Sequence, residues 1–94
     1  MEGMMDGVHV LTDGTRVWWS RGKIHREDGP AIERNDGTLR WIQNGLLHRE
    51  DGPAIVGTNG YTAWCLYGER LKVRTLKGLK KKLKELLIRK IMEA

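Results

Sequence analysis

The residues of this chain that are best suited to chemistry form a block of eight that occurs twice. His-Arg-Glu-Asp-Gly-Pro-Ala-Ile occupies positions 25–32 and recurs unchanged at 48–55. Each copy places an imidazole, a guanidinium and two carboxylates within four residues, a set that can move protons or hold a metal ion. A catalytic group is needed once, however, whereas this block recurs in each unit that has a successor. We therefore interpret His25, His48, Asp28 and Asp51 as structural residues that dock one unit to the next, with catalysis and ligand or metal contact as the alternatives.

A 23-residue period positions these blocks in the chain. It carries Trp18, Trp41 and Trp64, and glycine recurs at the same spacing at 14, 37 and 60 and again at 22, 45 and 68. Residues 6–14 form a shortened half-unit, and Leu71 onward replaces the block that would follow Gly68. Self-similarity at a fixed period, with atypical first and last units, is typical of repeat architectures. The first 70 residues therefore predict about three repeated units.

Each unit has the composition of a β-hairpin. Asn-Asp-Gly at 35–37 and Thr-Asn-Gly at 58–60 are strong turn signals, because Asn, Asp and Gly tolerate positive φ. The flanking runs are rich in Trp, Val, Ile, Thr and Tyr, which favour strands. A second turn is expected after each Trp strand, at 21–23, 43–45 and 67–69. The prediction is an antiparallel meander with strands near residues 8–11, 15–20, 31–34, 38–43, 54–57 and 61–66.

Alternation along these strands divides their side chains between two faces. The three tryptophans of the period share one face, where we expect a column that belongs to the core; stacking of bases or of partner side chains is the alternative. The next position holds Trp19, Ile42 and Cys65 and points the other way, and we expect Trp19 to be the exposed aromatic. Cys65 lies among apolar residues and is predicted to be a buried, inert thiol.

The segment from Thr75 to about Glu93 predicts an amphipathic helix with Thr75 as its N-cap. At ~100° per residue, an arc of about 140° collects Leu76, Leu79, Leu83, Leu86, Leu87 and Ile91. Most of the basic residues lie outside that arc, whereas Lys80 and Lys90 lie within it and their long stems can snorkel. Ile88 and Met92 fall on the polar side. We expect the apolar stripe to pack on one face of the sheet, and Ile88 and Met92 to meet a partner or a second copy.

The pattern of residues 6–70 resembles the MORN repeat family in a degenerate form. The resemblance rests on the 23-residue period and on Trp-x-x-x-Gly at 18–22, 41–45 and 64–68, each an aromatic strand followed by a glycine turn. Only the third unit keeps the family's first aromatic, as Tyr61; threonine replaces it in the other two. The resemblance implies a β-hairpin ribbon used for binding, of a kind familiar from small phage and large-virus proteins. It does not imply the family's membrane-lipid role, whose residues are not matched.

Charge divides the chain near residue 70. Residues 1–70 carry 8 Lys/Arg and 10 Asp/Glu, a net charge of −2, whereas residues 71–94 carry 9 and 2, a net charge of +7. We expect one structural domain made of a hairpin sheet over 1–70 and a basic helix over 71–94 that packs on or beside the sheet, an α+β fold. A single cysteine excludes an internal disulfide and a multi-cysteine zinc site. No signal peptide or membrane-spanning run is recognised, and we expect a cytoplasmic protein.

These features predict a small non-enzymatic protein-binding module without cofactor or metal. The MORN resemblance implies a phage-encoded inhibitor or modulator of a host protein, such as a defence or nucleic-acid-processing factor. We expect the sheet to be a rigid platform and the partner contacts to come from Trp19, Lys77, Lys80, Lys81, Lys84, Ile88, Arg89 and Met92. The leading alternative is a nucleic-acid-binding protein that uses the Lys-rich helix for salt-dependent phosphate contacts. A plain cap on the sheet, a membrane-surface helix and a homodimer are the other possibilities for this helix.

Overall fold

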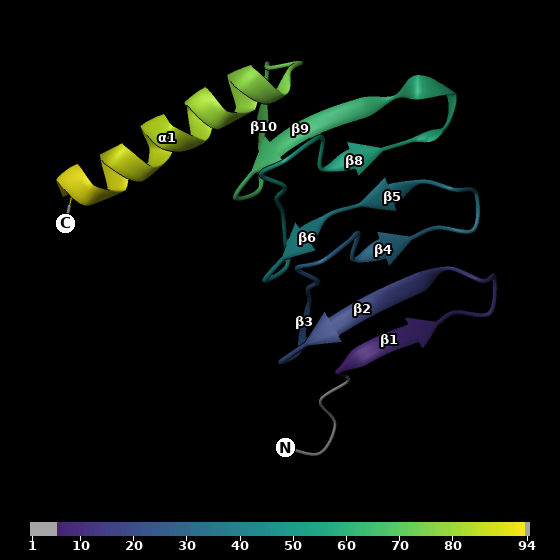
Figure 1. Cartoon of the computed structure of the whole chain (residues 1–94). Helices are drawn as coiled ribbons and strands as arrows, with labels where there is room; N and C mark the ends of the chain where they lie inside the picture. Colours follow the sequence, from purple (N-terminus) through teal and green to yellow (C-terminus); the bar gives the residue numbers. More distant parts are fainter. Residues whose placement is uncertain (1–5, 94) are drawn as a thin grey trace.

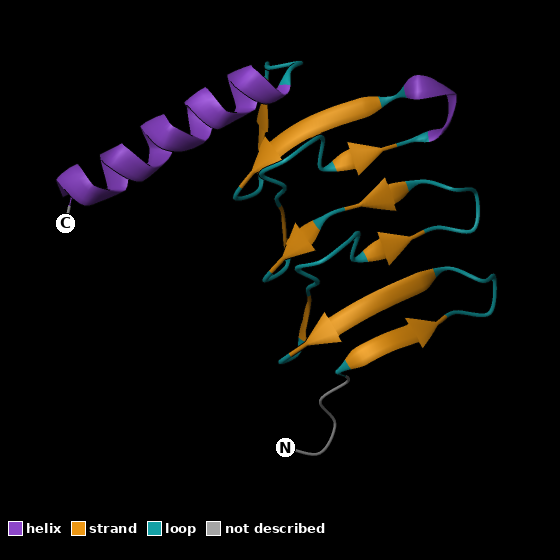
Figure 2. Cartoon of the chain, viewed as in Figure 1, coloured by secondary structure: helices purple, strands orange, loops and turns teal. Residues whose placement is uncertain are grey.

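The computed structural model describes residues 6–93, which form an antiparallel sheet of short strands followed by one helix (Figures 1 and 2). The predicted antiparallel hairpin meander with a C-terminal helix, an α+β fold, is confirmed. Figure 1 shows three hairpins stacked in chain order, and the short strands β3, β7 and β10 fold back onto β2, β6 and β9 along one side. The strands are β1 (Gly7–Val10), β2 (Arg16–Ser20), β3 (Lys23–Ile24), β4 (Ile32–Glu33), β5 (Leu39–Arg40), β6 (Ile42–Gln43), β7 (Leu46–Leu47), β8 (Ile55–Val56), β9 (Thr62–Leu66) and β10 (Glu69–Leu71).

The hairpins β1–β2, β4–β5 and β8–β9 join one another in a constant register. β2 pairs with β4, with Arg16 opposite Glu33, and β5 pairs with β8, with Leu39 opposite Val56. Each residue of the second pair lies one 23-residue period after its counterpart in the first pair, so the two junctions have the same register. The sheet order β1-β2-β4-β5-β8-β9-β10 leaves one outer edge at β1. At the other end β10 pairs only with residues 64–66 of β9, so Thr62 and Ala63 form a second outer edge.

The expected strand over 38–43 divides at Trp41 into β5 and β6. The backbone N–H of Trp41 donates to the Ala54 carbonyl of the next hairpin, while its carbonyl accepts from the backbone N–H of His48. The strand therefore changes partner at this residue, from β8 to β7. β2 and β9 change partner in the same way but stay continuous, because Val8 pairs with Trp18 and Leu71 with Trp64, whereas the pairing of β5 and β6 does not include Trp41.

The second turn of each unit is a two-residue turn in which both residues have positive φ. Arg21, Asn44 and Tyr67 have φ of 53°, 52° and 52°, and the glycines that follow them have φ of 78°, 81° and 83°. Two positive φ values are the signature of a type I′ turn, whose twist matches that of the flanking strands. Glycine supplies the second value without steric cost, whereas Arg21 and Tyr67 adopt the first against their intrinsic preference.

The core of this sheet is thin and consists mainly of small side chains. The tryptophans of the period are only half-buried, and Trp41 packs against a cluster of Ala54, Ala63 and Cys65. The expectation for Trp19 is wrong: it is half-buried like Trp18, and the equivalent residues in the next units are buried. The exposed aromatic rings are those of Tyr61 and Tyr67. The fully or nearly fully buried apolar residues are Val17, Ala31, Ile42, Ala54, Ala63, Cys65, Leu66 and Leu79.

The helix α1 (Leu76–Glu93) begins as predicted, because the backbone N–H of Gly78 donates to Thr75 Oγ1 at 3.1 Å. It lies beside the sheet, one of the two expected placements, and its apolar stripe does not cover a face of the sheet. Leu79 is its single buried residue, and Ile91 of the apolar stripe is exposed. Figure 1 shows that α1 starts beside β10 and runs away from the stacked hairpins. The first turns lie close to the sheet, and the helix then runs beside the turn at Tyr67 as far as Lys90.

Candidate functional site

Each histidine block joins one hairpin to the turn of the next. The backbone N–H of Asn44 donates to Nδ1 of His25 at 2.9 Å, and the backbone N–H of Tyr67 donates to Nδ1 of His48 at 2.9 Å. The arginine that follows each histidine adds a backbone bond across the same junction, at 3.1 and 3.2 Å. The two copies of the block therefore make the same contacts at two successive places in the stack.

These contacts fix the tautomer of both imidazoles. A backbone N–H can only donate, so Nδ1 is the acceptor and the neutral ring carries its proton on Nε2. Nε2 lies 3.2 Å from a carboxylate oxygen of Glu27 in the first block and 2.8 Å from one of Glu50 in the second. Neither nitrogen is left free to accept a proton from a substrate, so the geometry suits a structural clasp better than a general base.

The second junction is the more deeply packed of the two. The side chain of His48 is 2% exposed, against 16% for that of His25. The ring of His48 also lies 4.3 Å from the ring of Tyr67 between centroids. Loss of the His48 ring would therefore remove a buried side chain together with a part-buried hydrogen bond, which costs more than the loss of an exposed hydrogen bond.

The arginine of each block is held between an indole and a glycine. The guanidinium of Arg26 lies 4.0 Å from the ring centre of Trp18, and that of Arg49 lies 3.7 Å from that of Trp41. Each also bonds the carbonyl of the following proline and a carboxylate of its own block. A Cβ added at Gly29 or Gly52 would lie within 3 Å of the guanidinium carbon. The Arg-x-Asp-Gly-Pro spacing thus holds each guanidinium between a tryptophan ring and a glycine.

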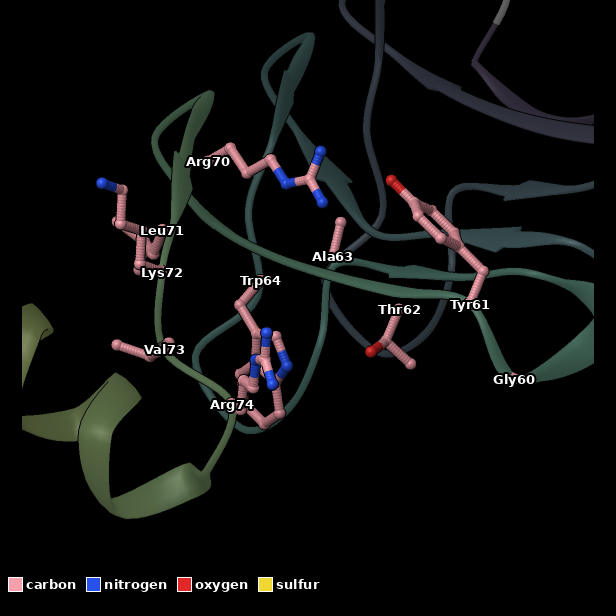
Figure 3. Close-up of a pocket in the computed structure, with 10 residues that line it drawn as sticks. All are labelled: Gly60, Tyr61, Thr62, Ala63, Trp64, Arg70, Leu71, Lys72, Val73 and Arg74. Carbon is pink, nitrogen blue, oxygen red and sulfur yellow. The ribbon is translucent and has the colours of Figure 1, made fainter.

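The third tryptophan lacks this arrangement. Position 72, one period after Arg49, is a lysine, and within residues 6–93 no cation lies over the Trp64 ring. An open concavity of about 880 Å³ lies here instead, lined by residues 60–64 and 70–74 (Figure 3). Its charged residues are all basic: Arg70, Lys72 and Arg74. Figure 3 shows Arg70 extending from β10 toward Tyr61, whose ring centre lies 6.0 Å from its guanidinium carbon.

The helix residues that the sequence predicted as partner contacts are all exposed. Lys80 is partly tied down, because its Nζ donates to the Glu50 carbonyl at 3.4 Å. Trp19 does not join this set: it lies on β2 in the first hairpin, whereas α1 follows the third (Figure 1). The exposed helix contacts are Lys77, Lys80, Lys81, Lys84, Ile88, Arg89 and Met92.

A groove between α1 and the last turn of the sheet was not predicted. It encloses about 370 Å³ and is lined by Leu46, Leu66 and Tyr67 on the sheet and by Leu86, Arg89 and Lys90 on the helix, among others. The ammonium of Lys90 lies 5.5 Å from the centre of the Tyr67 ring. The only sequence signal for this groove was the position of Lys90 within the apolar arc.

The remaining candidates for chemistry are accounted for by their surroundings. Burial raises the pKa of the Cys65 thiol, which keeps it protonated and unreactive at neutral pH. Over the described residues, 6–93, no group of three or more His, Cys, Asp or Glu side chains is arranged to hold a metal ion. Within the same range, no helix is long and apolar enough to cross a membrane.

No protein-family model, curated protein or solved structure matches this chain. The MORN resemblance therefore stays a prediction, and the arguments about function rest on the geometry described above.

Proposed function

We propose that this chain is a small protein-binding module without catalytic activity, and that the C-terminal half of α1 is its main contact element. The proposal rests on one observation: apolar side chains of this half face solvent. Ile91 is 74% exposed and Met92 is 79% exposed. Leu87 and Ile88 are also exposed, and Arg89 and Lys90 lie among them. Such a helix is suited to a hydrophobic groove with an acidic rim on a partner protein.

The rest of the molecule serves as a platform for this helix, which supports the assignment. The histidine blocks are used in holding the hairpins together, and the β10–α1 connection fixes the start of the helix. A rigid base lowers the entropic cost of presenting a contact surface. Within this class we retain the expectation drawn from the MORN resemblance, a phage-encoded inhibitor or modulator of a host protein that acts in the host cytoplasm.

The test compares three forms of the chain as affinity baits. Ile91→Asp/Met92→Asp removes the apolar contact, and Leu11→Asp is the matched control, because Leu11 is similarly exposed but lies in a sheet turn. A protein captured by the wild type is purified and titrated by calorimetry. We expect 1:1 binding that the helix variant weakens by about 30-fold or more, as for a hot-spot pair, and that the control leaves unchanged. Equal binding by the helix variant, or the absence of a stoichiometric partner, contradicts the proposal.

Nucleic-acid binding is the second candidate, favoured by the net charge of +7 over residues 71–94 and the exposure of Lys77, Lys81 and Lys84. Phosphate contacts would make the affinity fall steeply with salt concentration. A mobility-shift series on duplex and single strands, with a Lys80→Glu/Lys81→Glu/Lys84→Glu variant, tests it. Affinity that is independent of salt, or unchanged in the variant, rules this candidate out.

A further inference from the structure

The two ends of the hairpin stack are complementary in register. By the 23-residue period, β1 corresponds to β4 and β8, so Val8 corresponds to Ala31 and Ala54. The two alanines are 0% exposed because each lies against the preceding hairpin, and their carbonyls accept from Trp18 and Trp41 at 2.9 and 2.7 Å. Val8 is 49% exposed. β1 thus corresponds to β4 and β8, the strands that pair with a preceding hairpin. Within residues 6–93, however, no strand pairs with its outer edge.

At the other end of the stack, residues 62 and 63 of β9 form the edge with which such a strand would pair. The carbonyls of Tyr61 and Ala63 accept from β8 and the residues beside it, so the N–H and carbonyl of Thr62 between them point away from β8. At the other end, Leu11 donates inward to Thr15, so the N–H and carbonyl of Val10 point outward. Unpaired strand edges of this kind are templates for a further strand.

We propose that copies of this chain associate head to tail, with β1 of a second copy pairing antiparallel with β9 of the first. The registers of the two internal junctions, Arg16 with Glu33 and Leu39 with Val56, define the geometry. Continued by one period, they place Thr62 opposite Val10 of the second copy and Ala63 opposite its His9. The outward groups of Thr62 and Val10 then exchange two backbone hydrogen bonds.

The residues around the β9 edge favour β1 of a second copy as the strand that pairs there. The concavity of about 880 Å³ lies along residues 60–64, where a further strand would run (Figure 3). Its charged residues are three cations and no acid. Figure 1 shows the outer edges of β1 and β9 at opposite ends of the stack, with α1 leaving on the side of β10.

This contact is heterologous, because the surface that each copy offers differs from the one that it receives. Such contacts grow into open assemblies unless the rotation closes a ring. The mass of the wild type should therefore rise continuously with concentration over a range of about 10 µM to about 1 mM, as for a small, weak interface. A two-fold dimer through the helices or through two like edges would instead stop at twice the monomer mass.

Two proline variants separate the ends. Val10→Pro removes the outward N–H of β1, and Thr62→Pro removes that of β9; proline is tolerated where an edge N–H is unpaired. Tyr61, which would precede the second proline, has φ −66° and ψ 132°, the region that a pre-proline residue prefers. Val10→Thr and Thr62→Val are the matched controls, since both keep the N–H and the β-branched shape. Circular dichroism and unfolding midpoints establish that each variant is folded.

Sedimentation measures the mass of each variant alone and of the two proline variants mixed. We expect each proline variant alone to stay monomeric to a concentration at least ten times that at which the wild type associates, and both controls to associate like the wild type. The mixture should form a 1:1 dimer and nothing larger, because Val10→Pro retains a working β9 and Thr62→Pro retains a working β1. A wild type that is monomeric throughout, or a dimer that forms despite either proline, overturns the proposal. The helix variant Ile91→Asp/Met92→Asp should associate normally, so this result is independent of the proposed function.

Discussion

At the two internal junctions of this sheet, a histidine clasp and an arginine on tryptophan hold one hairpin to the next, whereas the outer side of the third hairpin has neither. Leu71 and Lys72 stand where the period would place the histidine and the arginine. The chain then turns away into α1 instead of forming another hairpin (Figure 1). The same strand positions that are covered at the junctions therefore line an open, basic concavity at the end of the stack.

This difference explains what the repeated block does. In each copy, the residue types that suggest acid–base chemistry are bonded to backbone groups or to one another. A block that makes identical contacts wherever two hairpins meet is required by the architecture, and its absence leaves an edge that other chains can reach. Substitutions at the junctions and at the open end test this contrast, from the largest expected effect to the smallest.

The first prediction compares equivalent tryptophans. Trp41→Ala should cost about 3 kcal/mol in the free energy of unfolding, because it removes an indole that packs on a buried cluster and carries the Arg49 guanidinium. Trp64→Ala should cost about half as much, since its ring carries no cation and borders open space. Urea unfolding followed by circular dichroism measures both values. Equal losses would remove the distinction between a junction and the open end.

The second prediction compares the two clasps. His48→Ala should cost about 2–3 kcal/mol, because it removes a buried ring and the acceptor of the Tyr67 backbone N–H. His25→Ala should cost about 1 kcal/mol, since water can replace the ring at the more exposed junction. His9→Ala, a histidine outside either block, is the control and should change stability least. A reversed order for His48 and His25 would contradict the role assigned to burial.

The third prediction concerns the hairpin turns and has the smallest effect. Hydrogen bonds from the backbone N–H groups of Thr15 and Thr38 lower the pKa values of Asp13 and Asp36, respectively. A carboxyl with a lowered pKa in the folded state contributes stability above its ordinary pKa, and this contribution is lost as the pH falls through the folded value. Asp13→Asn/Asp36→Asn should therefore lose less stability than the wild type between about pH 5 and pH 2. Melting temperatures measured across this range test the prediction, and identical slopes would refute it.

The third hairpin sharpens this last test. Its turn carries Asn59 instead of an aspartate, with φ of 60°. Asp13 and Asp36 do not have positive φ, so the third turn has a different backbone conformation, and Asn59 has no titrating group. The loss of stability at low pH that comes from the hairpin turns should therefore arise in the first two. An Asn59→Asp variant should lose no more stability at low pH than the wild type, unless its carboxylate also accepts a backbone N–H.

Some of the sequence predictions failed because they concerned burial. Alternation placed Trp19 correctly on the face opposite Trp18, but it did not show which face is buried, since both carry apolar residues. The buried side chains of Ile42 and Cys65 decide that point. Likewise, the helix has an apolar arc, but covering that arc requires sheet surface within reach, and beyond Leu79 the helix borders the sheet along the groove at Tyr67 rather than over a face. The groove at Tyr67 depends on segments about 20 residues apart and left only the position of Lys90 as a signal.

The sequence by itself determined the turns and the start of the helix, because each depends on neighbours within a few residues, and it shows the 23-residue period directly. Positive φ at an Asn-Gly pair and a Thr75 hydroxyl that accepts from Gly78 are local properties. Only the tertiary structure decided which histidine nitrogen meets which amide, where the guanidiniums lie and which edges stay open. Those outcomes depend on contacts such as His25 with Asn44 and His48 with Tyr67, which exist only after separate hairpins have stacked.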